Sequence, residues 1–350
     1  MSLRLALAAC LLITSCGAQK DASSGPHLDL ILADTPARKL SDYGLFTDSS
    51  ATNPSKRVVA YDLINPLFSD HAIKDRFIFV PGETFARYTK HDVFDFPIGT
   101  VLIKTFSFAP DLRAAGEGTY KIETRLLIHK QDGWAAFPYI WDASGSEATY
   151  APAGKQMDIS FTDPTGDPLT IRYAVPNKNQ CKTCHQSGDA VMPIGPKARN
   201  LNHEGPAGIN QLADWQARHI LEGVPADAPA VPAMWDSSFP LDERARAYLD
   251  INCAHCHKVD GSASNSGLWL DWDEASPVRY GLFKHPTAAG RGSGGRQIVI
   301  SPGQPEHSIL SFRMESDEPG IAMPELGRSI VDERGLSLIN EWIISLEAQD

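Results

Sequence analysis

The pattern of hydrophobic and polar positions changes once along the chain, near residue 176. Before that point, short runs of β-branched and aromatic residues alternate with turn signals such as Pro81-Gly82 and Asp132-Gly133. Strands are predicted at residues 74–81, 94–99, 101–108, 119–128 and 169–175. Because almost no helical periodicity interrupts these runs, residues 27–175 are predicted to form an antiparallel β-sandwich or barrel-like domain.

After residue 176 the apolar positions recur at helical spacing. Helices are predicted at residues 208–221, 241–252, 304–314 and 329–346, and the last of them carries an amphipathic stripe. Residues 223–240 are rich in Pro and Ala and are predicted to be a linker. The fold class expected from both halves is therefore α+β and multidomain, with a mainly α module after the β domain.

Length and charge narrow the class of protein. The chain has 350 residues, of which 42% are hydrophobic and 21% charged, and this composition is typical of a globular protein with two or three domains. Its formal net charge of −11 disfavours nucleic-acid binding. An acidic surface suits a protein partner with a basic docking face, although many soluble proteins have such a surface without a docking role.

The N-terminus reads as an export signal. Residues 1–15 contain Arg4 and then an apolar run too short to span a bilayer, which is typical of a signal peptide. The residues before Cys16 resemble a bacterial lipobox, so lipidation of Cys16 and membrane attachment through that lipid are expected. An ordinary signal peptide that happens to carry a cysteine there is the alternative. Residues 16–26 are a predicted tether, and no other stretch reaches transmembrane length.

Two Cys-x-x-Cys-His motifs carry the clearest chemistry of the chain. They comprise Cys181, Cys184 and His185 in the first case, and Cys253, Cys256 and His257 in the second. This is the attachment pattern of c-type haem: two thiols bond to the haem vinyl groups and the histidine binds the iron. Apart from Cys10 and Cys16 near the N-terminus, the motifs use every cysteine of the chain. Two covalently bound haems are therefore predicted, and export agrees with them because c-type haem is attached outside the cytoplasm.

Other uses of the four cysteines explain the sequence less well. A single zinc ion held by both cysteine pairs would not explain why a histidine, His185 or His257, follows each pair. Thiol–disulfide chemistry is disfavoured because no thioredoxin-like βαβ pattern surrounds either pair.

The distal ligands of the two irons differ in how well the sequence indicates them. For the second haem, Met323 lies just before the last predicted helix and is the expected ligand, while Met314 is the competing candidate. For the first haem, Met192 is a candidate only seven residues after His185; His203, Met234 and an open site are alternatives. His255, between the second pair of cysteines, is expected to be exposed.

Three weaker signals have simpler explanations. The aromatic residues near Trp134 could line a sugar-binding groove but more simply form a core with cross-strand pairs. His71, His91 and His129 lack the spacing of metal ligands. Residues 290–295 fit the Gly-x-Gly-x-x-Gly pattern without a preceding strand or a following helix, so they are predicted to be a loop.

Two resemblances follow from these motifs. The order of helix, Cys-x-x-Cys-His, loops, Met-Pro and terminal helix in residues 241–350 resembles a class I cytochrome c domain. Nearly the whole mature chain resembles a little-characterised bacterial family of exported di-haem c-type cytochromes. The segments that carry this second resemblance are residues 65–70, 96–106, 122–127, 181–185, 193–202, 250–257 and 323–327. Similar segments occur beside quinone-dependent sugar dehydrogenase domains, which implies electron transfer from a dehydrogenase.

The sequence thus predicts five segments and one favoured function. The segments are the signal peptide (1–15), tether (16–26), β domain (27–175), first haem segment (176–240) and second haem domain (241–350). The expected function is electron transfer in the periplasm or at the outer membrane. A di-haem peroxidase with an open first haem is one alternative, although 72 residues (257 minus 185) separate the histidines, a tight spacing for two ordinary cytochrome domains. A carbohydrate-binding module coupled to redox haems is the other.

Overall fold

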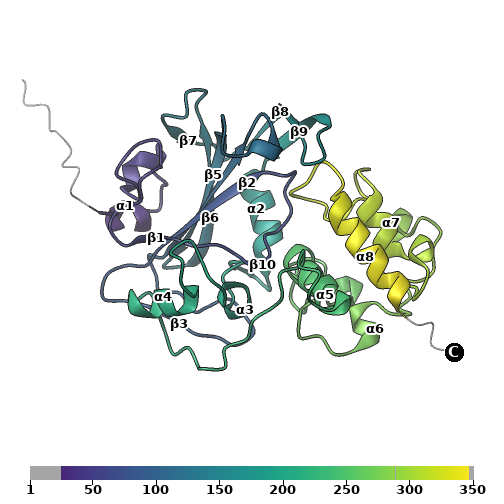
Figure 1. Ribbon diagram of the computed structural model, residues 1–350. Helices are drawn as coiled ribbons and strands as arrows, with labels where there is room; N and C mark the ends of the chain where they lie inside the picture. Colours follow the sequence, from purple (N-terminus) through teal and green to yellow (C-terminus); the bar gives the residue numbers. More distant parts are fainter. Residues whose placement is uncertain (1–24, 288, 347–350) are drawn as a thin grey trace, which may run out of the picture.

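A six-stranded antiparallel sheet forms the centre of the computed structural model, which describes residues 25–287 and 289–346 (Figure 1). Its strands lie in the order β1-β2-β4-β5-β6-β7. Their bounds are β1 (Val58–Ala60), β2 (Ile73–Phe79), β4 (Val101–Phe108), β5 (Tyr120–Lys130), β6 (Gly133–Trp141) and β7 (Ala148–Tyr150). Three predicted runs are strands of this sheet, whereas residues 94–99 contribute only an isolated bridge between Arg87 and Asp95.

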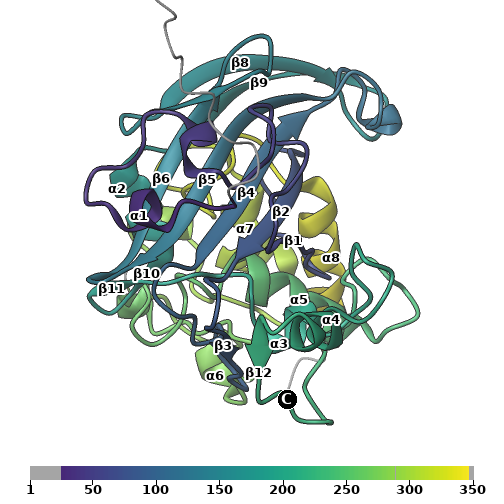
Figure 2. The same cartoon turned by 90° about the vertical axis from the view of Figure 1, so that its left-hand side faces the viewer.

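Six further strands form two-stranded pairs. A long ribbon of β8 (Lys155–Thr162) and β9 (Pro168–Val175) curves over the sheet (Figure 2). A small hairpin of β10 (Gln186–Ser187) and β11 (Ala190–Val191) follows the first Cys-x-x-Cys-His motif. The remaining pair is parallel and joins β3 (Ala86–Arg87) to β12 (Leu221–Glu222).

The N-terminal segment covers one face of the sheet. Val101 and Ile103 of β4 and Leu126 of β5 form a buried core with Leu40 and Tyr43 of that segment. The aromatic residues that suggested a sugar-binding groove lie in the interior: Phe137, Tyr139 and Trp141 belong to this core, Tyr150 packs against it, and Trp134 is buried in the core on the opposite face. Their burial favours a structural role for this aromatic run.

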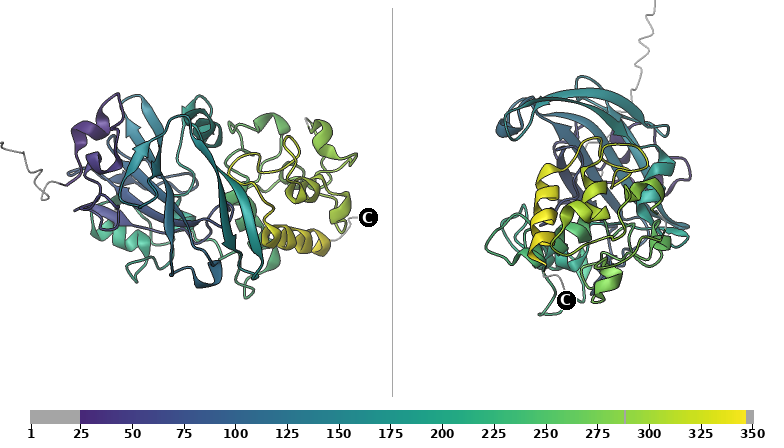
Figure 3. Two further views of the ribbon diagram at one scale, coloured as in Figure 1. Left: turned by 90° about the horizontal axis from the view of Figure 1, so that it is seen from above. Right: turned by 90° about the vertical axis from the view of Figure 1, so that its right-hand side faces the viewer.

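The opposite face of the sheet carries two separate apolar clusters. Ile78, Leu102 and Leu127 belong to a core near one end of the strands. Phe106 and Phe108 belong to a second core, which the β8–β9 ribbon completes. Between these clusters the same face carries charged residues, and it is turned toward the segments that contain the Cys-x-x-Cys-His motifs (Figures 1 and 3).

Eight α-helices occur in the described ranges, and the longest has 13 residues. They are α1 (Leu28–Leu32), α2 (Lys178–His185), α3 (Ala198–Leu201), α4 (Gln211–Ala217), α5 (Leu241–Asn252), α6 (Pro277–Tyr280), α7 (Ile309–Glu315) and α8 (Glu333–Ser345). Helices α5 and α8 pack closely, because a Cβ atom at Gly335 would lie 2.3 Å from Tyr248 Oη. None of the helices in the described part of the chain is long and apolar enough to cross a membrane.

The predicted fold class is wrong. The structure is rich in β-strands, built on one large antiparallel sheet with short helices, and it contains no mainly α cytochrome module. The helical pattern after residue 176 yields helices of four to 13 residues, because long stretches between them form turns and loops with their own backbone hydrogen bonds. The predicted helix at 329–346 begins only at Glu333, and that at 208–221 shrinks to Gln211–Ala217.

Specific polar contacts join the C-terminal helices to the sheet region. Asn65 donates from Nδ2 to the carbonyl of Pro232 and accepts at Oδ1 from the Met234 amide, both at 2.8 Å. Asp70 accepts from the amides of Ser329 and Ile330 at 2.7 and 3.2 Å. These contacts explain part of the 65–70 segment: its polar side chains satisfy buried backbone groups of the C-terminal region. The signal peptide and Cys16 lie outside the described residues.

Candidate haem-attachment site

The second Cys-x-x-Cys-His motif begins where α5 ends. Cys253 is the C-cap of this helix and donates its amide to Leu249 at 2.9 Å. The amides of Cys256 and His257 then both donate to the carbonyl of Cys253, at 3.2 and 3.0 Å. This tight turn places the two thiols and the imidazole of the motif on one short loop after a rigid helix.

A cavity of about 430 Å³ opens beside this turn. Cys253, Cys256 and His257 line it, and Met314 of α7 and Met323 line it as well. These residues fit a haem that is bonded to the two cysteine sulfurs and ligated by the histidine. A methionine sulfur is available from another wall of the cavity. Both candidate methionines contribute to the cavity.

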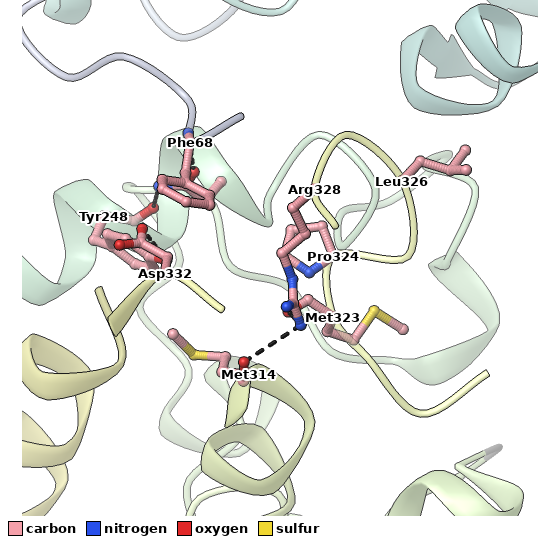
Figure 4. Close-up of a pocket in the computed structure, with 9 residues that line it drawn as sticks. Phe68, Tyr248, Met314, Met323, Pro324, Leu326, Arg328 and Asp332 are labelled. Carbon is pink, nitrogen blue, oxygen red and sulfur yellow. Dashed lines mark hydrogen bonds between the residues drawn. The ribbon is translucent and has the colours of Figure 1, made fainter. Parts of the chain in front are cut away.

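The loop that carries Met323 is fastened by one guanidinium group. Arg328 donates from Nη2 to the carbonyls of Met323 and Met314, at 2.8 and 3.3 Å, and to that of Ser316 at 2.7 Å. Figure 4 shows Arg328 between Met314 and Met323 in a smaller pocket next to the large cavity. Arg328 thus ties the Met323 loop to the end of α7, a role that the sequence analysis did not identify.

His257 is held as a neutral imidazole. Its Nδ1 lies 3.2 Å from Ser266 Oγ, which donates its own hydrogen to the Ala263 carbonyl at 2.7 Å and therefore accepts from the ring. Burial, with a smaller contribution from Arg313, lowers the pKa of His257 to about 4. A neutral ring with hydrogen on Nδ1 leaves the Nε2 lone pair for a metal.

The first motif ends helix α2, which lies against β6 of the sheet. Asn177 caps this helix and accepts from the amides of Asn179 and Gln180. His185 donates from Nδ1 to the carbonyl of Met192 at 2.7 Å, which fixes its tautomer and leaves Nε2 available. Burial lowers the pKa of His185 to about 4, so this imidazole is also neutral.

Met192 lies behind the His185 ring. Its amide donates to the His185 carbonyl at 2.7 Å, while its own carbonyl accepts from Nδ1, the ring nitrogen opposite the one that would bind iron. Its side chain packs against the core on the sheet face. This geometry favours an orienting role for Met192, because distal ligation would require the side chain to leave that core.

The other candidates for the first haem are engaged elsewhere. Met234 is 3% exposed in the core around α5. His203 contacts Gln211 through Nε2 at 3.0 Å. His255 differs from its prediction: it lines the large cavity, is not fully exposed, and its Nδ1 is buried with no hydrogen-bond partner in the described chain.

The two motifs meet at the same cavity, although 72 residues separate their histidines. Thr183 and Cys184 of the first motif lie on its wall with Cys253 and Cys256 of the second. Burial, with a smaller contribution from the nearby Cys256 thiol, raises the pKa of Cys184 to about 11. The hairpin after the first motif also contacts the second, because the Gly188 amide donates to the Asp260 carbonyl at 2.7 Å.

The thiols do not resemble those of redox or zinc sites. All four are free, and burial raises the pKa of each, to about 12 for Cys253. Reactive thiols of disulfide oxidoreductases instead have lowered pKa values. In residues 25–287 and 289–346, no three Cys, His, Asp or Glu side chains are arranged to hold a metal ion.

A buried ion pair sets the relative position of the two motif segments. Arg199 of α3 donates to Asp250 of α5 from Nη2 at 2.7 Å and from Nε at 3.1 Å, and both side chains are 3% exposed. Burial alone would raise the pKa of Asp250, but Lys197 and Arg199 lower it.

No family model, curated protein or solved structure matches this chain.

Proposed function

We propose that this protein is an exported di-haem c-type electron-transfer protein, with one haem attached at each Cys-x-x-Cys-His turn. The observation that carries the proposal is that both turns open onto one cavity, which a pair of chance matches would not explain. Bound haem supplies a one-electron couple between ferric and ferrous iron. Apolar side chains of the buried core, among them Leu268, Leu270 and Val299, line the cavity.

The roles of the residues follow from their positions. Cys181, Cys184, Cys253 and Cys256 form the thioether attachments, and His185 and His257 present Nε2 to the irons. Met323 is the proposed distal ligand of the second haem, on a loop that Arg328 holds in place. Adjacent attachment sites favour passage of an electron from one to the other.

The location and partner belong to the same proposal. Residues 1–15 direct export, and lipid on Cys16 anchors the protein to a membrane surface facing the periplasm. A dehydrogenase or another redox protein supplies the electrons. The net charge of −11 suits docking to a basic face on that partner.

Counting haems tests the proposal. The pair of variants Cys181→Ser/Cys184→Ser and Cys253→Ser/Cys256→Ser should each contain one covalently bound haem, where the natural chain contains two. Intact mass and the absorbance of the denatured haem report the number. Cys16→Ser is the matched control, because it should lose the lipid and keep both haems. A natural chain without covalent haem, or with zinc in its place, would refute the proposal.

One observation favours a second candidate function, a peroxidase-like enzyme. Met192, the nearest methionine to His185 in sequence, lies on the Nδ1 side of the imidazole and therefore not on the side that would bind iron. An open iron position permits reaction with peroxide, whereas two protein ligands favour electron transfer. A high-spin haem spectrum together with peroxide turnover would support the enzyme. Two low-spin haems that do not react with peroxide would support the carrier.

A further inference from the structure

A row of cations crosses the middle of the sheet on the face turned toward the first motif. Lys104 of β4 lies directly opposite Arg76 of β2 on one side and Arg125 of β5 on the other. Lys74, two residues from Arg76, points to the same face. We call Lys74, Arg76, Lys104 and Arg125 the cationic row.

The cationic row occupies the gap between the two apolar clusters of this face. Ile78, Leu102 and Leu127 lie toward one end of the strands, and Phe106 and Phe108 toward the other. Side chains directly opposite on neighbouring strands are about 5 Å apart, and like charges there repel. A sheet with only a structural purpose would continue the apolar face across this gap.

Ion pairs neutralise two of the four cations, and Asp70 and Asp332 act on Lys74 without forming an ion pair with it. Glu123, which is fully buried, pairs with Arg125 at 2.5 and 2.8 Å. Asp62 pairs with Arg76 at 2.9 Å, but its side chain is 56% exposed. The structure shows no other ion pair to these four cations in the described part of the chain.

Several donors of the row lack partners. Arg76 is 5% exposed, and its Nη2 is buried without a hydrogen-bond acceptor. Lys104 lies with Nζ 5.0 Å from the centre of the Phe106 ring and donates no hydrogen bond to any described residue. Lys74 donates only to the carbonyl of Leu67, at 2.6 Å. Leaving charged donors buried and unpaired costs several kcal/mol in typical cases.

The electrostatic consequences of this imbalance agree with the geometry. Burial, together with the nearby Arg76 and Arg125, lowers the pKa of Lys74 to about 7. Burial also holds the pKa of Lys104 well below its ordinary value. An anionic group in the gap would offset both effects.

The row faces the first motif rather than the second. Lys104 and Arg125 are close enough to His185 and to Cys184 to affect the pKa of both, and Arg125 also acts on Cys181. The charged side chains near the thiols and imidazole of the second motif are instead Arg313, Arg328, Lys197, Lys258 and Glu325. The two attachment sites therefore have different cationic surroundings.

We propose that the cationic row binds the two propionate carboxylates of the haem attached at Cys181 and Cys184. This inference rests on the proposed function. A c-type haem carries two carboxylates on the edge away from its thioether bonds, and the gap offers Arg76 Nη2 and Lys104 Nζ as unpaired donors. Guanidinium and ammonium groups bind carboxylates through charge-assisted hydrogen bonds. Cations beside a haem also favour its reduced form, since reduction lowers the net charge of the site.

The test is a redox titration of the holoprotein with Lys104→Met. One of the two haem potentials should fall and the other should stay. For a unit charge roughly 10 Å away at an effective dielectric constant near 20, the ratio of oxidised to reduced haem at fixed potential should change on the order of tenfold. Lys121→Met is the matched control, because Lys121 lies on β5 with its Nζ on the opposite face, donating to the Ser50 carbonyl. It should leave both potentials unchanged.

Further variants identify which haem the cationic row affects and which side chains of the row act on it. In the Met323→Ala background, the shift from Lys104→Met should fall on the haem that Met323→Ala does not affect. Lys104→Arg should restore the potential. Arg76→Gln should lower the same haem potential. It replaces Lys104→Met in the test if that variant does not fold.

Three outcomes would overturn the inference. Unchanged potentials in both Lys104→Met and Arg76→Gln would show that the row does not face a haem. Loss of a low-spin spectrum in Lys104→Met would make Lys104 an iron ligand instead. A shift of the natural protein's potential on adding acetate would show that the row binds free carboxylates. Haem content is measured first: fewer than two covalent haems contradicts the proposed function, whereas two haems with unmoved potentials contradicts only this inference.

Discussion

The first Cys-x-x-Cys-His motif ends an eight-residue helix that lies against the sheet, whereas the second follows a twelve-residue helix that packs against α8. Both motifs line one cavity. A backbone carbonyl, that of Met192, orients His185, while a side-chain hydroxyl, that of Ser266, orients His257. The first motif lies near the cationic row, and the second lines the cavity together with Met314 and Met323. Identical sequence motifs therefore receive different electrostatic surroundings, and those surroundings come from the elements packed around each turn.

This difference suits a pair of haems with unequal potentials. Cations near the first site, and the proposed methionine ligand at the second, would each favour reduced iron through different residues. Each potential is then open to separate change by mutation. The following predictions use that separation.

The largest effect should come from breaking the link between the two segments. Arg199→Met leaves Asp250 buried without its main partner, and removal of one member of a buried pair costs about 3–5 kcal/mol of unfolding free energy. Urea unfolding of the holoprotein measures this loss. Arg218→Met is the control: its partner Asp214 lies four residues away in the chain, Arg218 is 49% exposed, and the expected loss is at most about 1 kcal/mol. Equal losses in the two variants would show that the Arg199–Asp250 pair does not hold the segments together.

The same pair gives a pH dependence. Because the folded pKa of Asp250 is lowered, its contribution to stability is complete above the pKa of the unfolded carboxyl, about 3.9, and is lost as the pH falls through the folded value. The difference in unfolding free energy between the natural chain and Asp250→Asn should therefore shrink in acid. A difference that stays constant down to the pH of acid unfolding would contradict the assignment.

A middle-sized effect should separate the two haems. Met323→Ala should remove the long-wavelength sulfur-to-iron absorption band and lower one potential, because thioether ligation stabilises reduced iron. Potentiometric titration should leave the other potential in place. Met314→Leu is the matched control, since Met314 lines the same cavity and should keep the band. Loss of the band in Met314→Leu with its retention in Met323→Ala would reverse the ligand assignment.

The smallest effect should be that of Met192→Leu. Leucine keeps the backbone carbonyl that orients His185 and nearly the same volume in the core, so the change in unfolding free energy should stay below about 1.5 kcal/mol. The optical spectra of both haems should be unchanged. Conversion of one low-spin haem to a high-spin one would show instead that the Met192 sulfur binds the first iron.

The sequence alone determined the features that depend on neighbouring residues. The two Cys-x-x-Cys-His motifs need only five consecutive residues each, and their residue types are the basis of the proposed haem attachment. The predicted bounds of α5 and β4 match the structure, because continuous periodic patterns without Gly or Pro define both elements. The sequence pattern predicted helix wrongly at positions that form turns and loops, such as residues 329–332. The hydrogen bonds of these loops depend on the surrounding structure.

Tertiary structure decided everything that joins distant parts of the chain. Cys184 and Cys253 share a cavity only because α2 packs on the sheet and Arg199 holds α5. Lys104 and Arg125 gave a signal in the sequence, as charges within apolar strands, but their alignment with Arg76 depends on strand register. Register is fixed by burial of whole faces, which no single strand encodes. The motifs are the basis of the proposed haem attachment, and the fold decides which charged groups and side chains surround each motif.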